Sequence, residues 1–399
     1  MAATAIVVTS LFVTAVYSLR LRHRRCRLSR RNVREIWLLA GECPKLTSVL
    51  PTAMGGDDID DNNNNYDDEE DDDKDNATNP RILTTVTRAT TISDVDRRHG
   101  SSGMPTVVFL HGFGCTALEF GELARRTSAE LGIDAVTIDR IILTTAAATN
   151  DGDSFEMPRT ATVLAREVLT VLSRRGVRPP YLLVGHSYGG LVARVIAEEM
   201  TYADGTIVYG LVLLDPAHEG QFDAGMFPWD FSIGMHLSPY LFRIYRHVMA
   251  PLGLLHLMDE IDKFIFPPIH LIRCRETRLA ARRLYSDNPI VWSHVVDEWQ
   301  GCLLTFEQRR RKRPKTKDRP LPPGVLVIAN QRRYSPTLYP DMITQAFLRL
   351  HRPLLDENED TWQLVMANDS DHWIHLQQPQ LVIDSIRTVI ERSSRTPNY

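Results

Sequence analysis

The chain has 399 residues, 43% of them hydrophobic, which is enough for one large catalytic domain with a buried core and some appendages. Its formal net charge of −4 combines two opposed segments: residues 57–75 carry twelve acids and one lysine, and eight arginines lie between Arg20 and Arg34. The rest of the chain is close to neutral, so its charge gives no reason to expect a nucleic-acid partner.

The cysteines are odd in number and scattered, without a CxxC or a Cys/His ligand spacing: Cys26, Cys43, Cys115, Cys274 and Cys302. Such usage predicts neither a disulfide framework nor a metal site, and nothing in the sequence requires a cofactor. Unpaired cysteines are typical of proteins in compartments that keep thiols reduced, so we expect the chain to face the cytosol.

The N-terminus is apolar and then strongly basic. Residues 2–19 contain no charge, and as a helix they would reach about 27 Å, close to the thickness of a bilayer core. Because the arginines follow this run, we expect a single uncleaved anchor in residues 1–20 with a cytosolic catalytic domain behind it. An Arg-rich organelle presequence is the alternative. Residues 21–80 are expected to be a basic arm and an acidic, disordered linker.

Beyond this linker, short apolar runs alternate with helical patterns, which is typical of an α/β fold with a mostly parallel sheet. Strands are predicted at residues 106–110, 133–139, 181–184, 211–214, 325–328 and 364–366, and helices at residues 159–176, 191–200 and near the C-terminus. The long stretch before residue 325 contains helical patterns such as residues 239–249 and is rich in aromatic residues. We therefore expect one domain over residues 81–399 with an inserted helical cap at about 217–320.

A Gly-His-Ser-Tyr-Gly-Gly run at residues 185–190 fits the pattern G-x-S-x-G. Gly185 and Gly189 would permit a strained turn that lifts the hydroxyl of Ser187 above the sheet. The predicted strand directly before this run and the predicted helix directly after it are the context that such a nucleophile elbow requires. Ser187 is therefore the candidate nucleophile.

A second glycine-rich run, His-Gly-Phe-Gly at residues 111–114, follows the first strong strand. Backbone N–H groups in such a loop can point at a developing oxyanion. The predicted donors are the amide of Tyr188 and that of Phe113 or Gly114.

Together these motifs resemble the α/β-hydrolase superfamily. The resemblance includes the strand ending in Asp139-Arg140, the helix start at residues 158–161, and a strand that ends LLDPAH at residues 213–218. It implies an α/β-hydrolase fold, a Ser-Asp-His triad and an ester or amide hydrolase. A serine at the elbow argues against the epoxide-hydrolase and dehalogenase branches, which place an aspartate there.

The sequence departs from that family in three places. The usual Gly- and Ser-bearing loop after Asp139-Arg140 is replaced by residues 141–155, and no acid lies near the strand at 325–328, where many relatives keep the triad acid. A basic loop, residues 309–319, closes the predicted cap; it is expected to be solvated, or to bind anionic lipid.

His372 is the predicted general base, because it follows the last strand and an imidazole titrates near neutrality; His375 is the fallback. Asp215 is preferred as the triad acid because it ends the strand after the elbow's helix, at the sheet edge where catalytic groups gather. Asp341 is the alternative, since both acids fit the chain order Ser, Asp, His.

We therefore expect a membrane-tethered serine carboxylesterase or lipase-like enzyme that cleaves small to medium apolar acyl esters without a metal or cofactor. The apolar cap residues suit a lid over an acyl pocket. Two alternatives remain open: a catalytically silent, membrane-tethered binding module, and an acyltransferase on the same fold.

Overall fold

A computed structural model describes residues 82–87, 104–142, 158–200, 207–223, 225–250, 252, 269–287, 289–312, 321–330 and 339–395. The expected anchor, basic arm and acidic linker, residues 1–80, lie outside this range. No helix within the described part of the chain is both long enough and apolar enough to cross a membrane.

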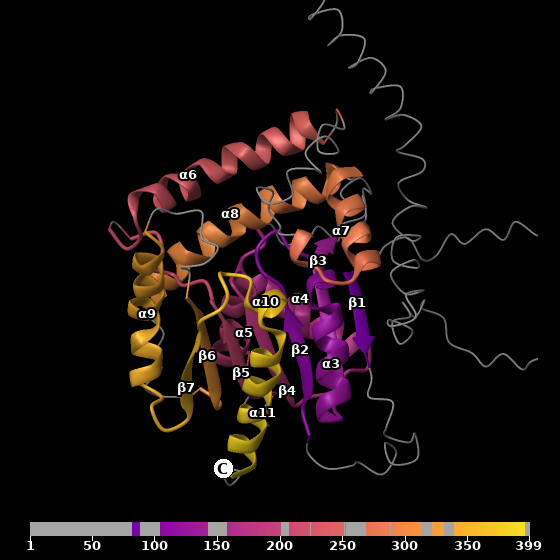
Figure 1. Cartoon of the computed structure of the whole chain (residues 1–399), viewed down its shortest axis with the longest axis vertical. Coiled ribbons are helices and arrows are strands. Elements are labelled where there is room, and N and C mark those ends of the chain that lie inside the picture. The colour runs from indigo at the N-terminus through magenta and orange to yellow at the C-terminus, as the bar shows by residue number, and fades with distance from the viewer. Residues whose placement is uncertain are drawn as a thin grey trace, which may run out of the picture.

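A seven-stranded sheet forms the centre of the molecule (Figure 1). Its strands, in spatial order, are β1 (Ile82–Thr87), β3 (Ala135–Ile142), β2 (Thr106–Leu110), β4 (Tyr181–His186), β5 (Val208–Leu214), β6 (Gly324–Ala329) and β7 (Trp362–Ala367). Strands β2 to β7 are parallel, and β1 pairs antiparallel with β3 at one edge. The central strands β4 and β6 are buried along their whole length, as parallel strands covered on both faces must be.

Helices cover both faces of this sheet. The helices α4 (Ala161–Arg174), α5 (Tyr188–Glu199) and α9 (Pro340–Asp356) pack on one face, and α3 (Gly121–Leu131) and α11 (Pro379–Arg395) pack on the other. Alternate residues of β2 divide between the two cores: Val108 and Leu110 contact the first set of helices, and Val107 and Phe109 the second. Two short elements, η1 (Ala117–Phe120) and α10 (Ile374–Gln377), complete the layer beside α3 and α11.

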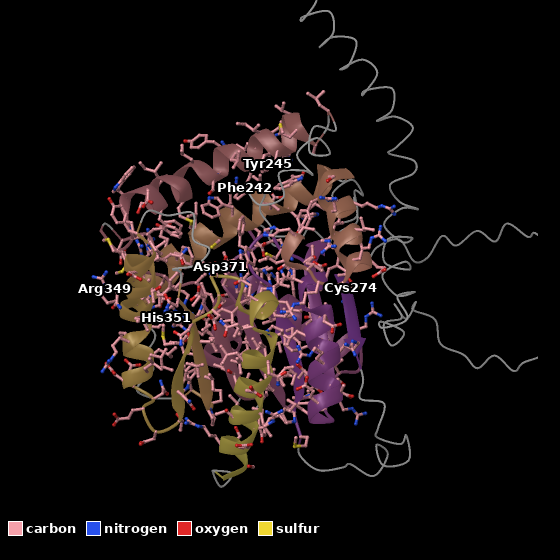
Figure 2. The ribbon with its side chains drawn as sticks, viewed as in Figure 1. Phe242, Tyr245, Cys274, Arg349, His351 and Asp371 are labelled. Atoms are coloured by element: carbon pink, nitrogen blue, oxygen red, sulfur yellow. The ribbon has the colours of Figure 1, made fainter. Side chains whose placement is uncertain are left out.

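The chain between β5 and β6 forms a helical cap over the carboxyl ends of the parallel strands (Figure 1). Its described elements are α6 (Trp229–Ile244), the π-helical turn η3 (Tyr245–Met249), η5 (Ile269–Leu271), α7 (Arg275–Asp287) and α8 (Pro289–Lys312). The cap has an apolar core of its own, with Trp292, Trp299 and Tyr285 among its buried residues. Phe242 and Tyr245 lie between α6 and α8 (Figure 2).

The predicted α/β fold is confirmed, and each predicted strand lies within or overlaps an observed one. The helix predicted at residues 191–200 begins three residues earlier, directly after Ser187, and the helical stretch predicted at 239–249 begins at Trp229. Helix α3 and strand β1 were not predicted. Helix α3 has an amphipathic sequence, but its mixed composition gave a weaker signal than the strands beside it.

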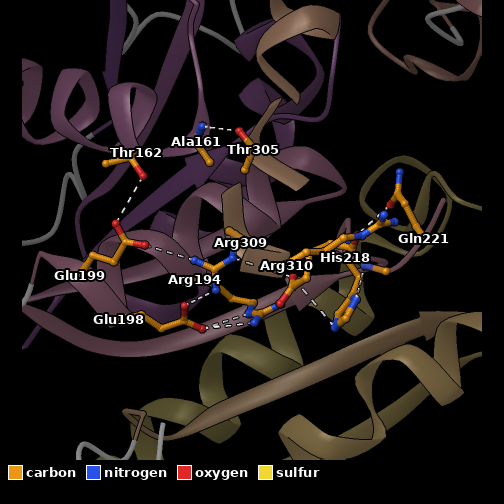
Figure 3. A network of polar contacts seen from close by, with 12 residues as sticks. Ala161, Thr162, Arg194, Glu198, Glu199, His218, Gln221, Thr305, Arg309 and Arg310 are labelled. Atoms are coloured by element: carbon orange, nitrogen blue, oxygen red, sulfur yellow. Dashed lines mark hydrogen bonds and ion pairs between the residues drawn. The ribbon is translucent and has the colours of Figure 1, made fainter. Parts of the chain in front are cut away.

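A buried network of ion pairs joins the end of α8 to α5, the helix that follows Ser187 (Figure 3). Arg309 pairs with Glu198, with Glu199 at 3.3 Å and with Glu219 at 3.8 Å. Arg194 donates to Glu198 at 3.2 Å and to Glu219 at 3.4 Å. Because both arginines are more than nine-tenths buried, loss of a partner would leave a charge without water, which is costly.

Candidate active site

Ser187 occupies a strained turn between β4 and α5. Its backbone has φ 52° and ψ −120°, a conformation that residues with a side chain rarely adopt and that costs on the order of 1–3 kcal/mol. The turn also needs glycine beside it, because a Cβ built on Gly189 would lie 2.3 Å from the carbonyl oxygen of Leu110. At Gly185 a Cβ would lie 2.6 Å from the carbonyl oxygen of Gly189. The geometry is that of a nucleophile elbow.

Asp215 and His372 meet at the same edge of the sheet, although 157 residues separate them. The Oδ2 atom of Asp215 lies 3.0 Å from Nδ1 of His372, and its Oδ1 atom accepts a hydrogen bond of 3.1 Å from the amide of Ala329. Since a carboxylate oxygen accepts, Nδ1 of His372 donates this hydrogen bond, and in the neutral form of the ring Nε2 is then the acceptor nitrogen. Asp215 is fully buried and the His372 side chain is 31% exposed, so this pair presents its imidazole outward.

The backbone fixes Asp215 tightly beside Ser187. Asp215 has a positive φ of 43°, and its amide donates to the carbonyl of Val327 at 2.8 Å. The next turn returns to the elbow, where the amide of Ala217 donates to the carbonyl of Ser187 at 2.8 Å. The strand-end aspartate and the elbow serine are thus held by adjacent strands of one sheet.

The alternative acid and the alternative base lie elsewhere. Asp341 is exposed near the start of α9, whereas the His372 ring hydrogen-bonds with Asp215. His375 is 2% exposed, and its Nε2 lies 3.5 Å from the carboxylate of Glu119. Burial lowers the pKa of His375, which keeps this ring neutral inside the protein.

His186, the residue before the nucleophile, supports the loop that carries His372. Its Nε2 atom donates to the carbonyl oxygen of His372 at 2.7 Å, and its ring centroid lies 4.6 Å from those of His372 and His375. Burial, together with these two neighbouring imidazoles, holds the pKa of His186 well below its ordinary value. A neutral ring that donates to a backbone carbonyl is a positioning group for the candidate base.

One expected oxyanion donor has another partner. The amide of Gly114 donates to Oε2 of Glu298 at 2.8 Å, so it does not point at a substrate, and the prediction for this residue is wrong. The candidate donors are therefore Phe113 and Tyr188. Tyr188 is the first residue of α5, and the N–H groups of a helix's first turn have no acceptor within the helix.

Glu298 belongs to α8, and it clamps the glycine-rich loop through Arg140. The Arg140 guanidinium donates to Oε1 of Glu298 at 2.9 Å and to the carbonyls of His111 and Gly112 at 2.7 and 3.0 Å. Burial acts to raise the pKa of Glu298, but the positive charge of Arg140, together with smaller contributions that include the hydrogen bond from the Gly114 amide, outweighs it and holds that pKa below its ordinary value. The cap thus contributes a charged group that fixes the loop opposite Ser187.

Aromatic side chains adjoin the same loop. The ring of Phe113 lies 5.5 Å from Phe242 and 5.2 Å from Trp299, and Phe222 lies 6.2 Å from Trp299 and 5.4 Å from Phe306. We call these five residues the aromatic cluster. The indole N–H of Trp299 is buried and, among the described residues, has no hydrogen-bond partner. The aromatic cluster thus packs the cap helices against the loop that contains Phe113.

The buried thiols do not provide a second nucleophile. Burial raises the pKa of both Cys115 and Cys302 well above the ordinary value, so neither forms a thiolate near neutrality. Across the described ranges, no group of three or more His, Cys, Asp or Glu side chains is arranged to hold a metal ion.

Comparison with known proteins places this geometry in a family. Residues 107–385 match the Alpha/beta hydrolase family, Abhydrolase_6. An uncharacterized Bacillus subtilis protein, YqjL, is 36% identical over 120 residues, which are 30% of this chain and 42% of that protein. The mouse sn-1-specific diacylglycerol lipase ABHD11 is 29% identical over 136 residues, which are 32% of this chain and 40% of the lipase.

The match to each of these two relatives thus spans less than half of the relative's length. Among solved structures, the Cif epoxide hydrolase from Acinetobacter nosocomialis superimposes with a TM-score of 0.53 at 11% identity, over 77% of this chain and 85% of that one. At this identity the likeness concerns the fold alone. With a family match that covers well over half of its length, the chain is a member of the Alpha/beta hydrolase family.

Proposed function

We propose that this hydrolase is a serine carboxylesterase or lipase-like enzyme that acts on small to medium apolar acyl esters. Ser187 is the nucleophile, His372 the general base and Asp215 the acid that orients the base. The hydrogen bond of 3.0 Å between His372 and Asp215, at the sheet edge that also holds the strained Ser187, is the observation that carries the proposal.

The reaction follows from these positions. Nε2 of His372 takes the hydroxyl proton as Oγ of Ser187 attacks the ester carbonyl, and the backbone amides of Tyr188 and Phe113 stabilise the oxyanion. The tetrahedral intermediate collapses, His372 returns the proton to the leaving alcohol, and an acyl-serine remains. Water, deprotonated by His372, then attacks the acyl-serine, and the carboxylic acid leaves as Ser187 regains its proton.

Two observations support an apolar acyl group. The aromatic cluster adjoins the loop that contains Phe113, so an acyl chain bound near the oxyanion site would contact aromatic rings. The mouse relative is a diacylglycerol lipase by name, and its matching 136 residues favour an acyl-ester substrate for this chain too.

Labelling with a fluorophosphonate tests the nucleophile directly, because such probes react with an activated serine. We expect wild-type protein and the Ser173→Ala control, which changes an exposed serine of α4, to be labelled and to hydrolyse a short p-nitrophenyl ester. Ser187→Ala should lose both properties while keeping its circular dichroism spectrum. Folded wild-type protein that takes up no label would instead favour the silent binding module.

If the wild type is labelled, product analysis separates hydrolysis from acyl transfer. A hydrolase releases free carboxylic acid when a primary alcohol is present in modest excess, whereas an acyltransferase forms the new ester in its place. We expect the acid, since nothing in the described part of the site is dedicated to a second alcohol.

A further inference from the structure

Helix α6 has an exposed apolar face that its place in the fold does not explain. Its members lie at spacings of three and four residues on α6 and η3, and each is 44–63% exposed: Trp229, Ile233, Leu237, Tyr240, Leu241, Ile244 and Val248. At about 100° per residue these positions fall within about one third of the helix circumference. We call this stripe the outer face of α6. Contiguous apolar surface of this kind marks an interaction site.

The opposite face of the same helix is already used. Phe242 and Tyr245 are buried against α8, where the ring of Tyr245 lies 4.8 Å from Trp292 (Figure 2). Phe242 also contacts Phe113 of the glycine-rich loop at 5.5 Å. This inner face, with Phe242 and Tyr245, therefore explains how α6 packs on the cap. The apolar residues of the outer face have no such packing role within the described structure.

Charge identifies the partner. Residues 229–250 contain a single acid, Asp230, at the start of α6, and two arginines, Arg243 and Arg246. By the same spacing of about 100° per residue, the exposed Arg243 lies along one edge of the outer face beside His236, whereas Arg246 lies on the side of the buried Phe242. An apolar stripe with a cationic border is the composition of helices that lie in the plane of a membrane, where the apolar side enters the acyl region and the cations face anionic headgroups.

We propose that the outer face of α6 docks onto a lipid surface that carries anionic headgroups. A second copy of the chain fits less well, because antiparallel pairing of two outer faces would place the two cationic borders side by side. Docking goes beyond the proposed esterase activity and does not depend on Ser187. It would bring the cap helix that contacts Phe113 to the boundary where apolar acyl esters dissolve.

Trp229 allows a direct test, because it is 61% exposed and belongs to the outer face. Full-length protein is mixed with vesicles of phosphatidylcholine and phosphatidylserine whose acyl chains carry bromine, which quenches tryptophan fluorescence on contact. The signal of Trp229 is the difference between wild type and Trp229→Phe. We expect this difference signal to shift to the blue and to be quenched.

Three substitutions sharpen the test. Leu237→Glu places a charge in the centre of the outer face, and we expect it to abolish quenching of Trp229. Met342→Glu is the matched control, because Met342 is 51% exposed on α9, and quenching should persist. With Arg243→Gln, quenching on mixed vesicles should fall towards the weaker quenching expected on phosphatidylcholine alone.

Sedimentation of the same samples shows whether the chain is on the vesicles, so an N-terminal anchor does not obscure the result. Protein that sediments with the vesicles while Trp229 stays unquenched would overturn the proposal. It is also overturned if the Trp229 signal shifts with protein concentration in the absence of lipid and a dimer sediments, since the outer face would then be a contact between copies. Equal quenching in wild type and Arg243→Gln would refute the electrostatic part.

Discussion

The edge of the sheet and the cap contribute to the candidate site in different ways. At the sheet edge the candidate catalytic residues are fixed by the backbone: Ser187 and Asp215 both have positive φ and both sit at the end of a buried strand. The cap is a set of helices with a separate core, joined to the sheet domain by buried ion pairs at Glu298 and at Arg309. In the proposed reaction the sheet would position the nucleophile and its acid, and the cap would hold the glycine-rich loop through Glu298.

The largest expected effect lies on the sheet side of this comparison. Asp215→Asn keeps the size of the side chain but removes the acceptor charge that orients His372, so turnover should fall about a thousandfold or more, on the order of 4 kcal/mol. Asp341→Asn, on the exposed start of α9, should retain near-normal turnover. Steady-state kinetics on one ester compares the two variants. The reverse result would make Asp341 the acid.

The next effect is on stability and comes from the network that ties the cap to α5. Arg309→Leu removes one of the two arginines that pair with Glu198 and Glu219 and leaves these buried carboxylates with Arg194 alone, so we expect the free energy of unfolding to fall by about 3 kcal/mol. Arg311→Leu is the control on the same helix: its side chain is 76% exposed, against 7% for Arg309, so little change is expected. Urea denaturation measures both. Equal stability of the two variants would show that the buried network is dispensable.

Substitution of Glu298 tests whether a cap residue affects the catalytic rate. Glu298→Gln weakens the pairing with Arg140 and with the amide of Gly114, so the glycine-rich loop should shift and kcat should fall roughly a hundredfold. Because the proposed acyl site is formed by the aromatic cluster and not by Glu298, KM should change little. Asp297→Asn, one residue away on α8, serves as control. A change in KM with unaltered kcat would assign Glu298 to substrate binding instead.

The smallest effect is on the pH dependence of stability, and it comes from two buried histidines, His218 after β5 and His351 in α9. Burial lowers the pKa of His351 to about 3 and that of His218, whose ring centroid lies 5.1 Å from it, to about 4. Both rings stay neutral in the folded protein, whereas in the unfolded chain they bind protons below about pH 6.5. The stability that these neutral rings contribute is therefore fully present above pH 6.5 and is lost as the pH falls from there to about 4 for His218 and about 3 for His351.

We expect each of these histidines to steepen the loss by about 1 kcal/mol per pH unit. Replacing one of them removes its contribution to this pH dependence. The unfolding free energies of His351→Gln at pH 7.5 and pH 5 should therefore differ less than those of the wild type. His236→Gln, an exposed position on α6, should keep the wild-type slope. An unchanged slope in His351→Gln would mean that this ring titrates normally in the folded protein.

Most of the sheet and its chemistry could be predicted from local pattern. Apolar runs bounded by turn residues identified six of the strands, and the glycines around Ser187 identified the elbow because their small size is a local requirement. Chain order was compatible with either Asp215 or Asp341. The structure brings only the former to His372.

The sequence by itself determined the α/β fold, the elbow and the small set of polar residues that could act there, because each depends on neighbours within a few positions. Tertiary structure alone decided that Gly114 pairs with Glu298, which lies 184 residues further along the chain, and that α6 leaves one apolar face outside. Such contacts depend on how the cap packs on the sheet, and packing over long sequence separations leaves no periodic signal in the chain.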